Sequence, residues 1–439
     1  MKKPMDNIFY LLNMSLSGIK NIEKEIKIDF FGKSVSKDFN PAKYKIKGIY
    51  GENGVGKSAI VTAVDIVKKF VVMDNYLRDY QSQLLLRELI NKNTRKFTFK
   101  CEFVSRIGAM FIYTYEVCFI IGDDDEIYVS HESLKYRQNS SKNKTATIFN
   151  NDDGKLTVLI SEGIEREAIL DKTRNLLGKQ SALSLMIDAV IGDEKNSELL
   201  ILLTCAMVFF FMLITHFDRE DIHEEYYRHI KLSNLKKDTP SIEKVLEEIE
   251  TTITSGSKRI AKEAYVEYQK KVKKLEKFIR LFKPELRSIE IDKKENKESY
   301  ECRLIMDYGS YRVDREFEST GIKKLMSLFD TMLLASRGAI VFIDEIDSNI
   351  NDVYLCRLLE YFKYYGKGQI CFTSHNLDPM TVLKENSKSI DFLTSDNKIV
   401  PWVKNGHYTP DNSFRNGLIA GMPFNIDSTD FIRVFEGEN

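Results

Sequence analysis

The sequence predicts a mixed α/β fold, and three features of the 439-residue chain support this prediction. A glycine-rich segment that begins at Gly51 lies between an apolar run and an apolar helix pattern. A second apolar run ends at two adjacent carboxylates, Asp344 and Glu345. Between these sites, three runs rich in β-branched and aromatic residues indicate an antiparallel β meander, and a helical stretch follows them. Strands and helices in this arrangement favour an α/β sheet with an added β meander.

Composition limits the function classes. The chain is 43% hydrophobic and 30% charged, which is typical of a soluble globular protein. Lys plus Arg and Asp plus Glu each number 65, so electrostatic capture of nucleic acid or membrane by the whole chain is disfavoured. The six cysteines form no C-x-x-C pair, and the N-terminus lacks the pattern of a signal peptide. We therefore expect a cytoplasmic protein without a zinc site or a disulfide framework.

Residues 1–160 are predicted to form a first lobe. Its strands are expected at Ile8–Ser15, Glu25–Phe31, Lys45–Tyr50, Lys96–Val104, Met110–Ile121 and Glu126–Arg137. Its helices are expected at Lys57–Met73 and Tyr76–Asn91. The polar segment Ser140–Asn151 is expected to be a surface loop.

Residues 161–283 are predicted to form a helical insertion. The apolar run Leu199–Ile214 would span about 24 Å as a helix, less than the roughly 30 Å of a bilayer core. Its flanks are mostly acidic, so a buried core helix is favoured over a membrane span. An apolar stripe from Val245 to Phe282 then predicts a helix pair or short coiled-coil arm, which Pro284 ends.

Residues 284–439 are predicted to form a second lobe. Strands are expected at Leu286–Ile291, Tyr300–Asp307 and Tyr311–Glu316. Helices and strands alternate from there to the C-terminus, including a helix at Leu325–Leu334 and strands at Ala339–Ile343 and Gln369–Thr373.

The glycine-rich segment fits the phosphate-binding pattern G-x-x-x-x-G-K-[ST], the Walker A motif. It follows a predicted strand and opens a predicted helix, which is the context that a phosphate site requires. Its backbone N–H groups can surround a β-phosphate, Lys57 can reach the β- and γ-phosphates, and the Ser58 hydroxyl can bind Mg²⁺. The predicted contact residues for ATP are Gly51, Glu52, Asn53, Gly54, Val55, Gly56, Lys57 and Ser58.

The apolar run Ala339–Ile343 and its two carboxylates have the pattern of a Walker B strand. Asp344 is expected to hold Mg²⁺, through water, and Glu345 to act as the general base on the attacking water. The alternative is a strand that simply ends in solvated acids.

Two further candidates follow from position rather than from composition. Ser319-Thr320-Gly321 precedes an apolar helix, where it could be an ordinary N-cap. His375 follows an apolar strand, and a lone histidine is more often structural than catalytic.

The order of these motifs resembles the ABC-type ATPases of the RecF, SMC and OLD group. The resemblance implies that Ser319 and Gly321 contact the γ-phosphate of ATP bound to a partner subunit, and that His375 is the switch histidine. It also implies homodimeric or larger assemblies whose heads close around ATP and Mg²⁺. Asp347 matches the D-loop acid, Lys20 or Asn21 is expected near the nucleotide, and Gln81 or Gln83 is the candidate for the family's glutamine.

Within that group the chain looks most like OLD-like ATPases of bacterial anti-phage defence, such as those of the PARIS and lactococcal abortive-infection systems. This narrower resemblance implies a regulator of a separate effector protein, a nuclease or a toxin. The alternative is a RecF- or SMC-like ATPase of DNA repair or chromosome maintenance. A transporter subunit is disfavoured by the altered signature, and a GTPase by the lack of an N-K-x-D motif.

The segment 258–283 separates the two main hypotheses. It holds ten basic and three acidic residues, so it could bind the phosphates of duplex DNA or an acidic protein. It could equally be the solvated outer face of a helix. No membrane contact is expected.

Overall fold

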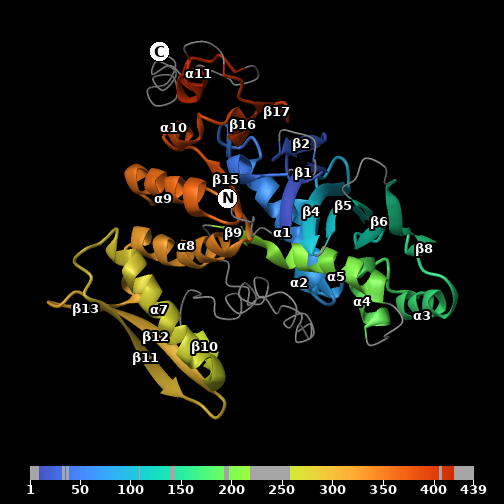
Figure 1. The fold of residues 1–439 in the computed structure, drawn as a ribbon, viewed down its shortest axis with the longest axis horizontal. Coiled ribbons are helices and arrows are strands. Elements are labelled where there is room, and N and C mark those ends of the chain that lie inside the picture. Colours follow the sequence, from blue (N-terminus) through green and yellow to red (C-terminus); the bar gives the residue numbers. More distant parts are fainter. Residues whose placement is uncertain are drawn as a thin grey trace, which may run out of the picture.

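A computed structural model describes residues 9–31, 35, 39–107, 109–138, 144–191, 197–217, 258–404 and 408–419. Three sheets organise this part of the chain (Figure 1). The mixed α/β class predicted from the sequence is confirmed.

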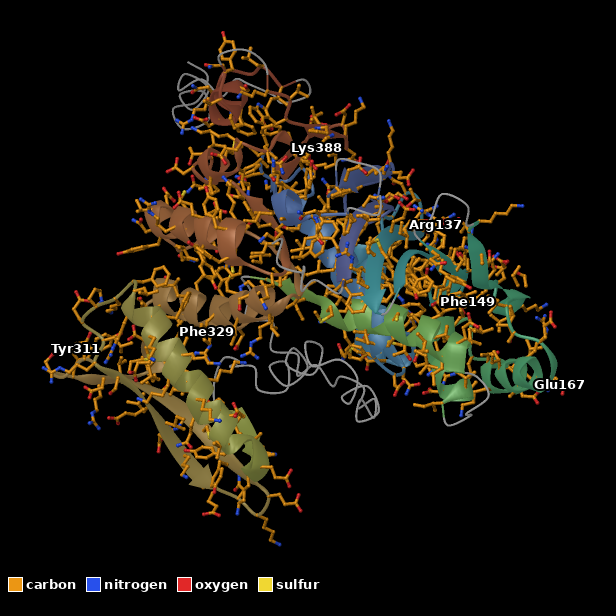
Figure 2. All side chains as sticks on the ribbon, in the orientation of Figure 1. Arg137, Phe149, Glu167, Tyr311, Phe329 and Lys388 are labelled. Carbon is orange, nitrogen blue, oxygen red and sulfur yellow. The ribbon has the colours of Figure 1, made fainter. Side chains whose placement is uncertain are left out.

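The largest sheet is antiparallel throughout, in the order β2-β1-β4-β5-β6-β7-β8. Its strands are β1 (Phe9–Ser17), β2 (Ile26–Asp29), β4 (Lys96–Ile107), β5 (Ala109–Ile121), β6 (Ile127–Gln138), β7 (Ala146–Asp152) and β8 (Lys155–Leu159). The predicted meander is thereby confirmed as β4-β5-β6. The loop predicted over Ser140–Asn151 is wrong from Ala146 onward, because Ile148 and Phe149 are buried in β7, which pairs with β6 (Figure 2).

The second sheet carries both predicted phosphate motifs. Its order is β17-β16-β3-β15-β14-β9, and only β17 runs antiparallel to its neighbour. The strands are β3 (Ile46–Tyr50), β9 (Leu213–His216), β14 (Ile340–Ile343), β15 (Gln369–Ser374), β16 (Ile390–Leu393) and β17 (Ile399–Pro401). Every residue of β3, β14 and β15 is buried, as expected for the inner strands of a parallel sheet. The loops after these three strands therefore meet at one edge of the sheet.

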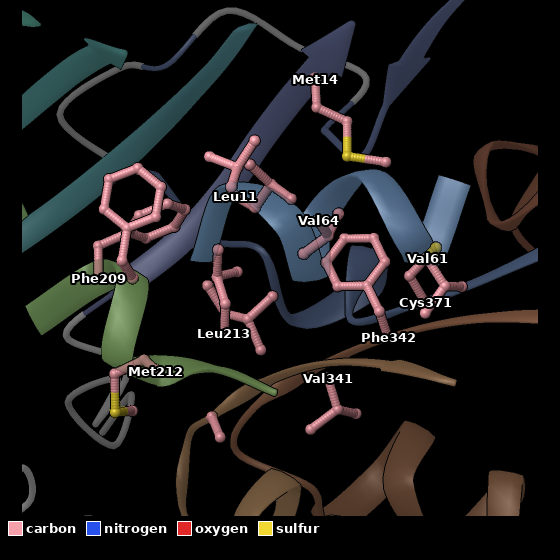
Figure 3. Close-up of a cluster of buried hydrophobic side chains, with 14 of the residues drawn as sticks. Leu11, Met14, Val61, Val64, Phe209, Met212, Leu213, Val341, Phe342 and Cys371 are labelled. Atoms are coloured by element: carbon pink, nitrogen blue, oxygen red, sulfur yellow. The ribbon is translucent and has the colours of Figure 1, made fainter. Parts of the chain in front are cut away.

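Helices α1 (Lys57–Val72) and α5 (Ser197–Met212) fill the space between the two large sheets. Phe70 of α1 packs on Phe119 of β5, with ring centroids 5.0 Å apart, and Phe209 of α5 stacks on Phe103 of β4 at 3.7 Å. Figure 3 shows side chains from β1, α1, α5 and β14 meeting in this apolar core. The helix that follows the glycine-rich loop is thus fixed from both sides.

The prediction of helix over residues 161–283 is wrong in two segments, Leu213–His216 and Lys258–Ala261, which are strands. Helices α3 (Gly163–Thr173), α4 (Ala182–Val190) and α5 agree with the prediction, but Leu213–His216 forms β9, parallel to β14. The apolar run therefore continues from helix α5 into the second sheet, where the β-branched Ile214 and Thr215 fit a strand. In the described residues, no helix is long and apolar enough to cross a bilayer.

The third sheet and one helix form what we call the β10–β13 module. It comprises β10 (Lys258–Ala261), α7 (Tyr265–Arg280), β11 (Ser288–Glu295), β12 (Ser299–Asp307) and β13 (Arg312–Asp314). The predicted helical stripe is wrong at Ile260, which lies in β10, and its part from Val245 to residue 257 lies outside the described residues. In Figure 1 the module, in yellow, lies beside α8 (Thr320–Arg337) and apart from the two large sheets.

The module is attached to α8 by polar and aromatic contacts. The Lys271 ammonium of α7 lies 2.8 Å from the Asp330 carboxylate of α8, and both side chains are buried. The Phe278 and Phe329 rings are 5.4 Å apart. Because a buried ion pair is costly to separate, α7 and α8 are expected to move together.

The remaining helices lie around the second sheet and the end of β6. They are α2 (Tyr80–Leu89), α9 (Asp352–Tyr365), α10 (Pro379–Leu383) and α11 (Pro410–Arg415). Both predicted lobes contribute strands to the second sheet, so the division at 160/161 and 283/284 stays a prediction about sequence organisation.

Candidate functional site

The loop between β3 and α1 has a backbone that only glycine tolerates easily. Gly54 and Gly56 have φ angles of +80° and +107°, in the left-handed region. A Cβ on Gly56 would lie 2.7 Å from the Asn21 side-chain oxygen. The Asn21 amide in turn donates a 2.7 Å hydrogen bond to the Gly54 carbonyl. The segment after β1 therefore holds the loop in place.

Lys57 is the first residue of α1, and only 5% of it is exposed. Its ammonium donates to the carbonyls of Gly51 and Glu52, at 2.8 and 2.7 Å. Burial lowers the pKa of Lys57 to about 8, although nearby carboxylates, Glu345 above all, act in the opposite direction. A buried ammonium beside the N–H groups of a helix N-terminus is a site that favours anions.

The two carboxylates after β14 are held in different ways. The Thr373 hydroxyl of β15 donates to the Asp344 carboxylate at 2.6 Å and accepts the Glu345 N–H at 2.8 Å. Glu345 has a φ of +47°, an uncommon value for a residue with a side chain. Such strain clusters at functional sites, and here it accompanies a carboxylate that faces the glycine-rich loop.

His375 directly follows β15 and borders the same site as Lys57 and Glu345. The Asp347 carboxylate accepts the backbone N–H groups of His375 and Asn376, at 3.3 and 3.0 Å. The imidazole lies between two site residues, with Nδ1 3.4 Å from the Lys57 ammonium and Nε2 3.9 Å from the Glu345 carboxylate. Burial, and then the Lys57 charge, lower the pKa of His375, so the ring is neutral at neutral pH.

The glycine-rich loop, Lys57, Glu345 and His375 line one cavity of about 460 Å³. Its lining comes from four places in the sequence: Lys20, Asn21, Asn53, Gly54, Gly56, Lys57, Ser58, Ala59, Glu345 and His375. Both members of the expected pair Lys20 and Asn21 contribute. The alternative in which Glu345 is merely a solvated strand end is disfavoured by this convergence.

Mg²⁺ fits the donor set around the cavity. In the described part of the chain no group of three or more His, Cys, Asp or Glu side chains could hold a metal ion. Mg²⁺ typically takes one or two protein oxygens together with water and substrate phosphates, and the Ser58 hydroxyl and the Asp344 carboxylate are oxygen donors of this kind. Ser58 lines the cavity, whereas Asp344 is not in the lining, although its charge opposes the lowering of the pKa values of Lys57 and His375. The expected contact of Asp344 with Mg²⁺ through water stays a prediction.

Ser319 and Gly321 do not join the cavity of their own chain. Ser319 is the N-cap of α8, where its exposed hydroxyl accepts the Ile322 N–H at 3.4 Å. A Cβ on Gly321 would lie 3.0 Å from the Asn349 carbonyl. Neither residue is in the lining, so within one chain the structure does not bring them together with Lys57.

Gln83 has a structural role in the fold. Its side-chain amide donates to the Leu77 carbonyl at 2.6 Å, and its side-chain oxygen accepts the Ile127 N–H at 2.8 Å. The side chain is buried and does not line the cavity. The structure therefore gives Gln83 no place at the site.

Comparisons with known proteins yield distant matches only. No protein-family model matches the chain, and no curated protein matches it. A solved structure of the recombination mediator RecF with ATPrS is 11% identical and covers 91% of this chain and 100% of its own, with a TM-score of 0.38. A RecF–ATP structure is 12% identical and covers 86% and 94%, with a TM-score of 0.35. At such values neither structure supports a conclusion about this chain.

Proposed function

We propose that this chain is an ABC-type ATPase that binds and hydrolyses ATP. One observation carries the proposal: Lys57, Glu345 and His375, which follow three different strands, line a single cavity of about 460 Å³ at a helix N-terminus. A buried ammonium and helix N–H groups favour a triphosphate. The neighbouring carboxylate and neutral imidazole are suited to handling a water molecule beside it.

Each residue then has a role. Lys57 releases its two loop carbonyls and binds the β- and γ-phosphates, while the loop N–H groups from Gly51 to Gly56 surround the phosphate chain. Glu345 accepts the proton of the attacking water, and His375 donates to the γ-phosphate. Ser58 and Asp344 would hold Mg²⁺, which neutralises charge on the phosphates when it is bound.

The assembly we propose is a homodimer. Ser319 and Gly321 lie outside the cavity of their own chain, at the exposed N-terminus of α8. A hydroxyl and free helix N–H groups form half of an anion site, and a second copy would supply the nucleotide. Two chains arranged in this way enclose two ATP molecules.

The test is ATP binding by the purified chain. Lys57→Ala is expected to weaken ATP affinity at least 100-fold, because charge-assisted hydrogen bonds to phosphate contribute about 1.5–3 kcal/mol each. Lys69→Ala is the matched control, since Lys69 lies on the same helix and pairs with Asp65 outside the cavity. Equal ATP affinity for the two variants, measured by calorimetry, would contradict the proposed site.

For the biological role we propose regulation of a separate effector, a nuclease or toxin, in anti-phage defence. The support is the narrower family resemblance together with a proposed dimer that ATP opens and closes, which suits a switch. Co-expression with the neighbouring reading frame should give phage protection or toxicity that depends on Lys57. Full protection by this chain alone would contradict a separate effector.

The alternative role is a DNA clamp of the RecF or SMC kind, through residues 258–283. Within the part of the chain that the structure describes, at least six of the ten basic residues there contact acids: Lys262, Lys270, Lys271, Lys273, Arg280 and Lys283. This pairing reduces the charge available to DNA phosphates. Duplex binding that weakens with salt and is lost in Lys274→Glu/Lys277→Glu would favour the clamp.

A further inference from the structure

Glu318, which immediately precedes Ser319, is a buried carboxylate at the start of α8. Only 8% of the residue is exposed. One carboxylate oxygen accepts the Ser319 N–H at 3.1 Å, and the other accepts the Tyr308 hydroxyl. The Glu318 side chain therefore joins the backbone of Ser319 to a second part of the chain.

That second part is the β10–β13 module. Tyr308 follows β12, and Lys283 follows α7. The Lys283 ammonium lies 4.0 Å from the Glu318 carboxylate and 4.5 Å from the centre of the Tyr308 ring. Burial, and then the bond to Glu318, raise the pKa of Tyr308, so its hydroxyl remains a donor at every physiological pH. The module thus contributes two of the three described groups that contact the Glu318 carboxylate, and the third is the Ser319 N–H.

The contacts of Glu318 lie where the β10–β13 module meets α8. Figure 2 labels Phe329 on α8 beside the module and Tyr311 on the loop that precedes β13. Tyr311 stacks on Tyr308 at 4.8 Å, and the Lys271–Asp330 pair joins α7 to α8 about three turns beyond Ser319. A displacement of Tyr308 or Lys283 at this end of the module would therefore change the contacts of Glu318 directly, while α7 and α8 stay paired at Lys271 and Asp330.

We propose that Glu318 is a positioning residue for the ATP site of the partner copy, and that the β10–β13 module controls it through Tyr308 and Lys283. Glu318 fixes the Ser319 backbone, and with it the direction in which the Ser319 hydroxyl and the first N–H groups of α8 point. A force on the module changes that direction. The inference rests on the proposed ATP-dependent dimer.

The experiment uses the full chain carrying Glu345→Gln, which should bind ATP and accumulate as the closed dimer. Tyr308→Phe removes one hydroxyl, and Glu318→Gln removes the charge while keeping the size. Each is expected to raise the protein concentration needed for ATP-induced dimerisation about tenfold, the scale of one lost charge-assisted hydrogen bond. ATP affinity of the single chain should stay within twofold, because neither residue lines the cavity.

Glu316→Gln is the matched control, since Glu316 is exposed and lies two residues before Glu318. Analytical ultracentrifugation gives the dimerisation, and thermal unfolding gives the stability of each variant. A lowered unfolding temperature with unchanged dimerisation would make Glu318 a purely structural cap and overturn the inference. Glu345→Gln protein that binds ATP without dimerising would overturn the proposed dimer, and this inference with it.

Discussion

The cavity at Lys57 and the helix start at Ser319 are both anion sites, but they are built in different ways. The cavity is assembled from four segments that are distant in the sequence. Its ammonium is buried enough to lower the pKa of Lys57 to about 8. Ser319, by contrast, is an exposed N-cap whose hydroxyl accepts one N–H of its own helix. The cavity has room for a ligand. The N-terminus of α8 presents its hydrogen-bond donors on the exposed surface.

This difference separates binding from assembly. A triphosphate can bind in the cavity of one chain, because Lys57, Glu345 and His375 of that chain converge there. The donors at Ser319 gain a ligand only when another molecule brings one. Substitutions at the two sites should therefore have separable effects, and the following four predictions test that separation.

The largest effect is expected on turnover. Glu345→Gln should lower the ATP hydrolysis rate about 10²–10⁴-fold, the usual contribution of a general base, while ATP still binds. Steady-state phosphate release and equilibrium ATP binding measure the two quantities. Glu360→Gln is the control, because the Glu360 carboxylate on α9 pairs with Arg357 and does not line the cavity. Undiminished turnover in Glu345→Gln would assign the base to another residue.

The second effect is on assembly. Ser319→Arg places bulk and positive charge at the position that the proposed dimer would bring close to the partner's Lys57. ATP-induced dimerisation of the Glu345→Gln chain should weaken at least about 30-fold, which corresponds to about 2 kcal/mol. Affinity of the single chain for ATP should not change. Equal loss of both would mean that Ser319 belongs to the cavity after all.

The third effect is a pH dependence of ATP binding. Lys57 must be protonated to bind phosphate, and burial lowers the pKa of its free form to about 8. Affinity should therefore be full below pH 8 and fall about tenfold per pH unit above it. The pKa of His375 is lowered, so its titration lies below pH 6.5 and outside this window. ATP affinity that is constant from pH 7.5 to 9.5 would contradict a direct contact with Lys57.

The smallest effect is expected from Gly321→Ala. The added Cβ would lie 3.0 Å from the Asn349 carbonyl, a tight contact, while alanine favours the helix by up to about 1 kcal/mol. Stability should change little, whereas ATP-induced dimerisation should weaken a few-fold because the methyl group narrows the approach to the helix N–H groups. Thermal unfolding measures the stability, and ultracentrifugation measures the ATP-induced dimerisation. Unchanged dimerisation would remove Gly321 from the interface.

Sequence reasoning succeeded where a structural motif is local. The loop Gly51–Ser58 and the acids after Ile343 are contiguous motifs, and the structure places them at one edge of the second sheet. It failed where pairing decides the outcome: Ala146–Asp152 and Leu213–His216 became strands because partners in β6 and β14 were available. A local sequence pattern does not identify the strand with which a segment will pair.

The sequence by itself determined the class of the fold, the phosphate motif and the two carboxylates, because glycines, an apolar run and charges at fixed spacing constrain the backbone directly. Only the tertiary structure decided that Asn21 holds the loop at Gly54 and that Lys57 lies close to His375. The same is true of Glu318, whose carboxylate is joined to the β10–β13 module through Tyr308. These contacts join residues whose separation in the sequence carries no information about distance. For Lys57 and Glu318, burial adds to the strength of the contacts, because a charged group removed from water depends on the few partners it meets.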